Sequence, residues 1–92
     1  MGRIAVTDGI SDEAKTLLEK SGHEVVVKFY SMKELQDGVL SNFDAVIVRS
    51  ATKITADVIA ASKSGLSVIG RAGVGVDNID LAAAGKAGIP VV

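Results

Sequence analysis

The sequence predicts a single α/β domain spanning residues 1–92, in which five parallel strands form an open sheet with helices on both faces. Two patterns support this prediction. Short aliphatic runs without polar alternation are typical of strands buried on both faces of a parallel sheet, and helical segments with start signals separate them. Because parallel crossovers are right-handed and both faces need helices, we expect the flavodoxin-like strand order 2-1-3-4-5.

The five expected strands are the aliphatic runs of the chain. They are rich in valine and isoleucine, which favour extended backbone. In chain order they cover residues 4–6, 25–27, 45–48, 68–69 and 89–92.

Four helices are expected between these strands. Ser31 with Glu34 three residues later is a capping box, which predicts a helix start. The expected helices cover residues 11–20, 31–40, 55–61 and 80–87. A glycine follows three of them, at Gly22, Gly65 and Gly88, where we expect left-handed helix caps.

Composition narrows the range of partners. Ten basic and eleven acidic residues give a net charge of −1, so the overall field favours neither nucleic acid nor an acidic membrane surface. The chain contains no cysteine, which removes thiolate chemistry and fits a reducing compartment. No apolar run approaches the roughly 18 residues of a membrane span. We therefore expect a cytoplasmic protein that binds neither nucleic acid nor membrane.

Basic residues gather at the predicted ligand edge. In open parallel sheets, ligands bind beyond the carboxyl ends of the strands, near the point where the strand order reverses. Arg49 and Lys53 follow the third strand, and Arg71 follows the fourth. These cations lie beside the amino ends of two expected helices, which also favour anions. This arrangement predicts a site for a small carboxylate or phosphate.

The glycine-rich stretch 70–78 follows the fourth strand and is not a dinucleotide fingerprint. A match to G-x-G-x-x-G that starts at Gly73 and Gly75 requires a third glycine where the chain has Asn78. The two glycines would instead let the main chain of Val74 approach an anion closely. The alternative is a turn that needs positive φ, with solvated charges beside it. The sequence alone leaves both interpretations open.

No residue is assigned to catalysis or to a metal. His23, the one histidine, falls on the turn before the second strand, away from the predicted site, where we expect a structural or surface role. Asp8 follows the first strand on the ligand edge and is a candidate for contact with the site. Asp77 and Asn78 are interpreted as residues that fix the loop entering the last helix, with contact to the ligand as the alternative.

Two stretches carry a resemblance to a known family. VRSATKIT at 48–55, followed by VIGRAGVGVDNID at 68–80, resembles the amino-terminal part of D-2-hydroxyacid dehydrogenases. The resemblance covers essentially the whole chain and implies a flavodoxin-like substrate-binding domain. It also implies that the NAD-binding domain and the catalytic histidine, acid and arginine belong to sequence that is not in these 92 residues.

The resemblance also implies roles for individual residues. Arg49 and Ser50 would receive a phosphorylated hydroxyacid, with Lys53 as a weaker candidate. The amides of Val74 and Gly75, with Gly73 beside them, would hold the substrate carboxylate. Val74 would in addition face the nicotinamide ring of NAD. Arg71 would either contact the anion or brace the loop.

The implied activity of the parent enzyme is NAD-dependent oxidation of 3-phosphoglycerate on the route to serine. We expect the isolated chain to be inactive, to bind no NAD and to bind small anions weakly. The alternative is an excised or engineered scaffold that has no ligand and self-associates. In either case, we expect a homodimer joined near the fifth strand.

Overall fold

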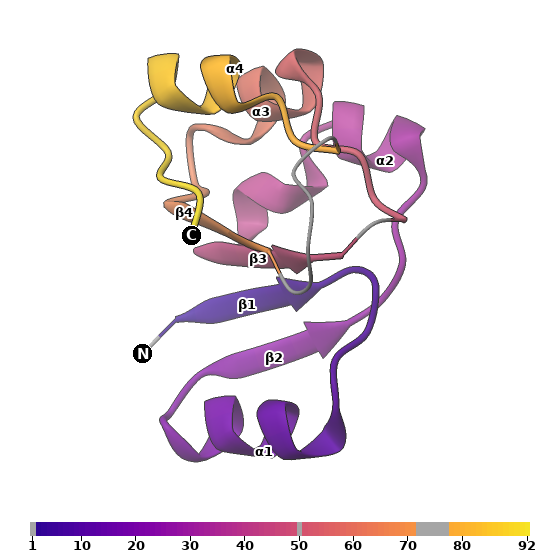
Figure 1. Cartoon of the computed structure of the whole chain (residues 1–92), viewed down its shortest axis with the longest axis vertical. Helices are drawn as coiled ribbons and strands as arrows, with labels where there is room; N and C mark the ends of the chain where they lie inside the picture. Colours follow the sequence, from indigo (N-terminus) through magenta and orange to yellow (C-terminus); the bar gives the residue numbers. More distant parts are fainter. Residues whose placement is uncertain (1, 50, 72–77) are drawn as a thin grey trace.

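A computed structural model describes residues 2–49, 51–71 and 78–92. Within them, four parallel strands form one sheet in the order β2-β1-β3-β4 (Figure 1). The strands are β1 (Arg3–Val6), β2 (Glu24–Val27), β3 (Ala45–Val48) and β4 (Val68–Arg71). The predicted order is confirmed for these four strands, so the direction of strand addition reverses between β1 and β3.

The prediction of a fifth strand was wrong. Residues 89–92 run beside β4 but form a single bridge, between Val91 and Ile69. Three main-chain hydrogen bonds hold them there, from Ile69 N to Pro90 O, from Arg71 N to Val92 O and from Val92 N to Ile69 O, each of 3.0 Å. Pro90 has no N–H to donate, so the ladder beside β4 cannot extend from Val91 back toward Ile89.

Helices cover both faces of the sheet unequally. The α1 helix (Asp12–Lys20) lies on one face, whereas α2 (Met32–Gln36), α3 (Ala56–Ser62) and α4 (Leu81–Lys86) lie on the other (Figure 1). The capping box of Ser31 and Glu34 is present, as predicted. The second helix does not continue to Leu40, however. It ends at Gln36, and Gly38, with a φ of 89°, separates it from a short 3-10 helix, η1 (Val39–Asn42).

The core lies on the face covered by three helices. Ala5, Val46 and Ile69 occupy neighbouring positions across β1, β3 and β4, and each has no exposed surface. Residues of η1, α3 and α4 pack over them, including Leu40, Val58 and Ala84. By contrast, α1 contributes no fully buried side chain. The aliphatic core predicted from the sequence is therefore built mostly on one side of the sheet.

Gly65 fills a different role from the predicted helix cap. Gly22 and Gly88 adopt positive φ angles of 93° and 74°, as expected, but Gly65 does not. A Cβ atom on Gly65 would lie 1.8 Å from the main-chain oxygen of Ser41. Gly65 is therefore required by the close approach of two backbones, at the amino edge of the sheet.

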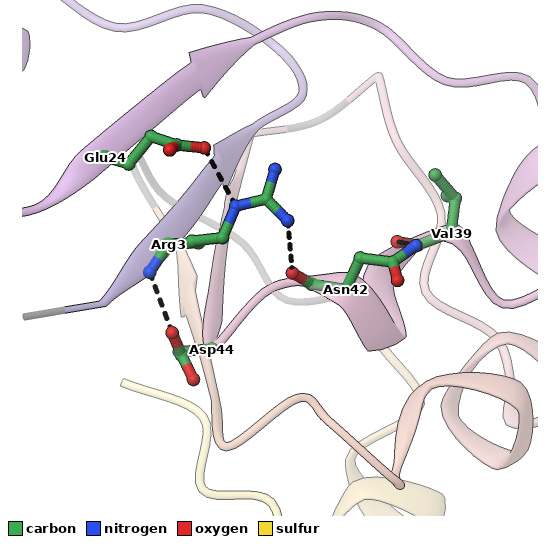
Figure 2. A network of polar contacts seen from close by, with 5 residues as sticks. All are labelled: Arg3, Glu24, Val39, Asn42 and Asp44. Atoms are coloured by element: carbon green, nitrogen blue, oxygen red, sulfur yellow. Dashed lines mark hydrogen bonds and ion pairs between the residues drawn. The ribbon is translucent and has the colours of Figure 1, made fainter.

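Arg3 organises that amino edge (Figure 2). Its Nε pairs with Glu24 Oε2 at 2.8 Å, and its Nη1 donates to the main-chain oxygen of Asn42 at 2.9 Å. Its main-chain N–H donates to Asp44 Oδ2 at 2.8 Å, and its guanidinium lies 4.8 Å from the centre of the Phe43 ring. One arginine thus ties β1 to β2 and to the segment that enters β3.

Candidate functional site at the carboxyl edge

Two loops meet where the strand order reverses. Residues 7–9 leave the carboxyl end of β1, and residues 49–54 leave the carboxyl end of β3, its neighbour in the sheet. The segment 78–80 lies beside the loop after β3, because Ile54 and Ile79 form a parallel bridge. In this bridge, Ile54 N donates to Asn78 O at 2.7 Å and Asp80 N donates to Ile54 O at 2.9 Å. The structure therefore brings the loop after β3 and the end of the glycine-rich stretch together.

Asp8 binds the main chain of the loop after β3. Its Oδ2 accepts hydrogen bonds from Arg49 N at 2.7 Å and from Thr52 N at 3.1 Å. Its Oδ1 accepts one from the hydroxyl of Thr52 at 2.6 Å. Thr52 is 2% exposed, so Asp8 also satisfies a buried hydroxyl. Asp8 lies at the carboxyl edge of the sheet, as predicted, and its contacts are with this loop.

Asn78 binds the same two residues from the opposite side. Its Nδ2 donates to the main-chain oxygen of Arg49 at 2.5 Å and to that of Thr52 at 2.8 Å. Arg49 and Thr52 are thus each held by Asp8 at the N–H and by Asn78 at the C=O. Asn78 was expected to fix the loop that enters the last helix; its side chain fixes the loop after β3 instead.

The hydrogen bonds to Asp8 keep its carboxylate charged. Partial burial works against the charged form, but the Thr52 hydroxyl and the amides of Arg49, Thr52 and Ala51 outweigh it and lower the pKa of Asp8. At neutral pH the site therefore contains a fixed negative charge beside its cations.

Two of the three predicted cations lie on this loop. Arg49 and Lys53 are both exposed, and neither forms an ion pair with any residue in the ranges described above. Arg71 ends β4 and is partly buried; its Nε is buried and has no hydrogen-bond partner within those ranges. Ser50, Gly73, Val74, Gly75 and Asp77 lie outside the described residues, so the structure neither places nor excludes them.

The opposite edge of the sheet differs in charge. His23 lies there, as expected, and its Nδ1 accepts a hydrogen bond from Gly2 N at 3.2 Å. It lines an open hollow of about 500 Å³ with Arg3 and three acids, Glu19, Glu24 and Asp44. This excess of negative charge disfavours a carboxylate or phosphate ligand. The amino edge therefore gives no support to an anion site there.

Other site types find little support in the described part of the chain. None of its clusters of histidine and carboxylate side chains could hold a metal ion. Likewise, no helix in it is long and apolar enough to cross a membrane.

The Asp8 and Asn78 contacts were not predicted from the sequence. The sequence offered one signal for the Asp8 contacts, which is an aspartate directly after the first strand. Because Asp8 and Arg49 are 41 residues apart, predicting their contact requires β1 and β3 to be neighbours in the sheet.

Comparison with known proteins shows what this arrangement is similar to. Residues 4–92 match the family model described as D-isomer specific 2-hydroxyacid dehydrogenase, catalytic domain. The D-3-phosphoglycerate dehydrogenases of Archaeoglobus fulgidus and Methanocaldococcus jannaschii are 47% and 46% identical over 98% and 100% of this chain. The chain spans 17% of the length of each of these relatives.

Solved structures of other proteins have the same fold as this chain. A Pyrococcus horikoshii protein, PH0520, superposes with a TM-score of 0.89 at 38% identity, over 99% of this chain and 27% of its own. The NAD⁺-bound 3-phosphoglycerate dehydrogenase of Entamoeba histolytica gives a TM-score of 0.80 at 34% identity, over 98% of this chain and 32% of its own. This chain therefore belongs to the D-isomer specific 2-hydroxyacid dehydrogenase family.

Proposed function

We propose that this chain is the substrate-binding part of an NAD-dependent D-3-phosphoglycerate dehydrogenase and that it binds the phosphorylated hydroxyacid at the carboxyl edge of its sheet. The names and identities of the relatives support the substrate class. The observation that carries the location is the geometry of Arg49. Its main chain is held at both the N–H and the C=O, while its side chain is exposed at the reversal of strand order.

Charge and exposure support an anionic ligand at this loop. Arg49 offers a planar guanidinium that suits phosphate or carboxylate, and Lys53 adds a second cation four residues later. We assign Arg49, Ser50 and Lys53 to the phosphorylated end of the substrate. The amides of Val74 and Gly75 are assigned to its carboxylate, since Gly73 and Gly75 leave room for a close approach.

We propose that the 92 residues alone neither bind NAD nor turn over substrate. The sequence contains no G-x-G-x-x-G fingerprint for the pyrophosphate, and its one histidine lies at the amino edge. Hydride transfer requires cofactor, base and substrate to be held in one geometry. In the longer enzyme, Val74 would face the nicotinamide ring of NAD.

An NMR titration with 3-phosphoglycerate tests the location. Exposed ion pairs contribute only about 0–1 kcal/mol each, so we expect millimolar affinity. Amide shifts should centre on residues 49–53 and 70–76. Arg49→Ala should abolish them, whereas Lys63→Ala, which removes an equal charge from an exposed position after α3, should leave them unchanged. Shifts centred on His23 and Lys63 would contradict the assignment.

A second candidate function is self-association near residues 89–92. An apolar groove of about 430 Å³ lies between α1 and the sheet and includes Leu17, Ile47 and Val92. Leu17, on the α1 side of the groove, is 67% exposed. We propose a homodimer through this groove. Sedimentation at about 100 µM should show a dimer that Leu17→Glu converts to monomer by burying a charge in the interface; a wild-type monomer would contradict the proposal.

A further inference from the structure

We infer that Asp8 and Asn78 form a clamp that positions Arg49, without either side chain contacting the bound anion. This inference rests on the proposed function, since it names the residues that position the cation of that same site. The clamp consists of the five hydrogen bonds through which Asp8 and Asn78 hold the main chain and the hydroxyl described above.

The first argument concerns the amides of the loop. Loops that bind an external anion do so with successive N–H groups that converge on it. Here the N–H groups of Arg49 and Thr52 converge on the carboxylate of Asp8. They are therefore occupied by an anion that belongs to the chain. A ligand at this loop therefore cannot use these two N–H groups, and the exposed side chain of Arg49 is available for contact with it.

The second argument concerns geometry. A guanidinium on a freely moving loop would lose conformational entropy on binding an anion, whereas a fixed backbone removes part of that loss in advance. The peptide groups on both sides of Arg49 are held, the preceding one by Asp8 and the following one by Asn78. Thr52 is held in the same way, so both ends of the segment 49–52 are fixed.

The third argument concerns the link between the two predicted substrate loops. Asn78 ends the glycine-rich stretch, and its main-chain oxygen accepts a hydrogen bond from Ile54 N. Its side chain reaches back to Arg49. The clamp therefore sets the distance between the loop that carries Arg49 and the point where residues 70–77 end.

The charge of Asp8 allows a test, because electrostatics and the clamp predict opposite changes in the affinity for 3-phosphoglycerate. A carboxylate near an anion site repels the ligand, so electrostatics alone predicts that Asp8→Asn binds 3-phosphoglycerate more tightly than the wild type. A clamp predicts the reverse, because asparagine offers the loop one uncharged acceptor oxygen in place of the two charged oxygens of Asp8, which weakens the hydrogen bonds that hold the loop. We expect Asp8→Asn to weaken binding about fivefold. Asn78→Ala, which leaves the charge unchanged, should weaken binding by a similar factor.

Asp57→Asn is the matched control for charge. Asp57 is exposed in the first turn of α3, close in sequence to the same loop, so the substitution removes an equal charge without touching the clamp. It should leave binding unchanged or slightly tighter. Equal or tighter binding by Asp8→Asn, with all three variants folded by their amide spectra, would overturn the inference.

Amide chemical shifts and hydrogen exchange test the clamp in the absence of ligand. Amides that donate to a carboxylate resonate downfield and exchange slowly, so the Arg49 and Thr52 amides should show both properties in the wild type. Asp8→Asn and Asn78→Ala should each speed their exchange, while amides of β1 and β3 remain protected. If the wild type fails to bind 3-phosphoglycerate, the proposed function is wrong; unchanged exchange of these amides in both variants would overturn the clamp itself.

Discussion

The two edges of the sheet use charged residues in opposite ways. At the amino edge, the guanidinium of Arg3 is engaged by Glu24 and by the main chain of Asn42 (Figure 2). It also lies over the ring of Phe43. At the carboxyl edge, an acid is engaged instead, since the carboxylate of Asp8 accepts hydrogen bonds from the loop after β3. One edge binds its cation within the fold, whereas the other holds a loop that presents its cations to solvent.

This difference separates an edge whose charged residue stabilises the chain from the edge at which we propose that a ligand binds. The contacts of Arg3 join β1 to β2 and to the segment before β3, so they contribute to the folded state without any partner. Arg49 and Lys53 make no ion pair with residues for which the structure gives positions. Substitutions at the amino edge should therefore change stability, and substitutions at the carboxyl edge should change anion binding.

The largest effect on stability is expected at Gly65. A Cβ atom there would overlap the main-chain oxygen of Ser41, so one backbone segment at the amino edge must move. We expect Gly65→Ala to lower the free energy of unfolding by about 2–4 kcal/mol, measured by urea denaturation.

Gly85 is the matched control for this substitution. It lies within α4, and a Cβ atom would meet nothing within 4 Å. Gly85→Ala should raise the free energy of unfolding by about 0.5–1 kcal/mol, because alanine is the better helix former. Equal effects of the two substitutions would mean that the close approach at Gly65 relaxes at little cost.

Sequence patterns predicted the parts of the fold that local physics determines. Aliphatic runs mark strands buried on both faces, and the right-handed crossover rule then restricts their order, so β1 to β4 and their arrangement were correct. The capping box at Ser31 was correct for the same reason, because it needs only residues three apart. The break of the second helix also had a local signal, because the predicted helix 31–40 included Gly38, and glycine disfavours a helix interior.

Features that depend on contacts between distant residues were not predictable in this way. The role of Gly65 depends on Ser41, which only the folded chain brings near it. The clamp joins Asp8 and Asn78 to residues between 26 and 44 positions away. The cations Arg49 and Lys53 could be assigned to an edge from strand order alone, but what fixes their loop could not. The fifth strand predicted over residues 89–92 is only a single bridge at Val91, and Pro90 lacks the N–H that would extend it toward Ile89.

A smaller loss of stability is expected at Arg3. Its side-chain contacts are partly exposed, with 48% of the Arg3 side chain and 60% of the Glu24 side chain accessible, so solvent screens the ion pair. We expect Arg3→Ala to lower the free energy of unfolding by about 1 kcal/mol, from the lost hydrogen bonds and the contact with Phe43. Its affinity for 3-phosphoglycerate should equal that of the wild type. A variant that loses binding while remaining folded would contradict the separation between the two edges.

The smallest effect concerns the response of the carboxyl edge to acid. The pKa of Asp8 is lowered in the folded chain, so its contribution to stability is fully present above the unfolded value of about 3.9 and is lost as the pH falls through the folded value. The free energy of unfolding of the wild type should therefore exceed that of Asp8→Asn at pH 6, and the difference should shrink below about pH 4. Urea denaturation of both proteins between pH 6 and pH 2.5 measures it, with Gly65→Ala as the control, since its deficit arises from a main-chain contact and involves no titratable side chain. A difference between wild type and Asp8→Asn that stays constant down to pH 2.5 would show that the charge of Asp8 does not hold the loop.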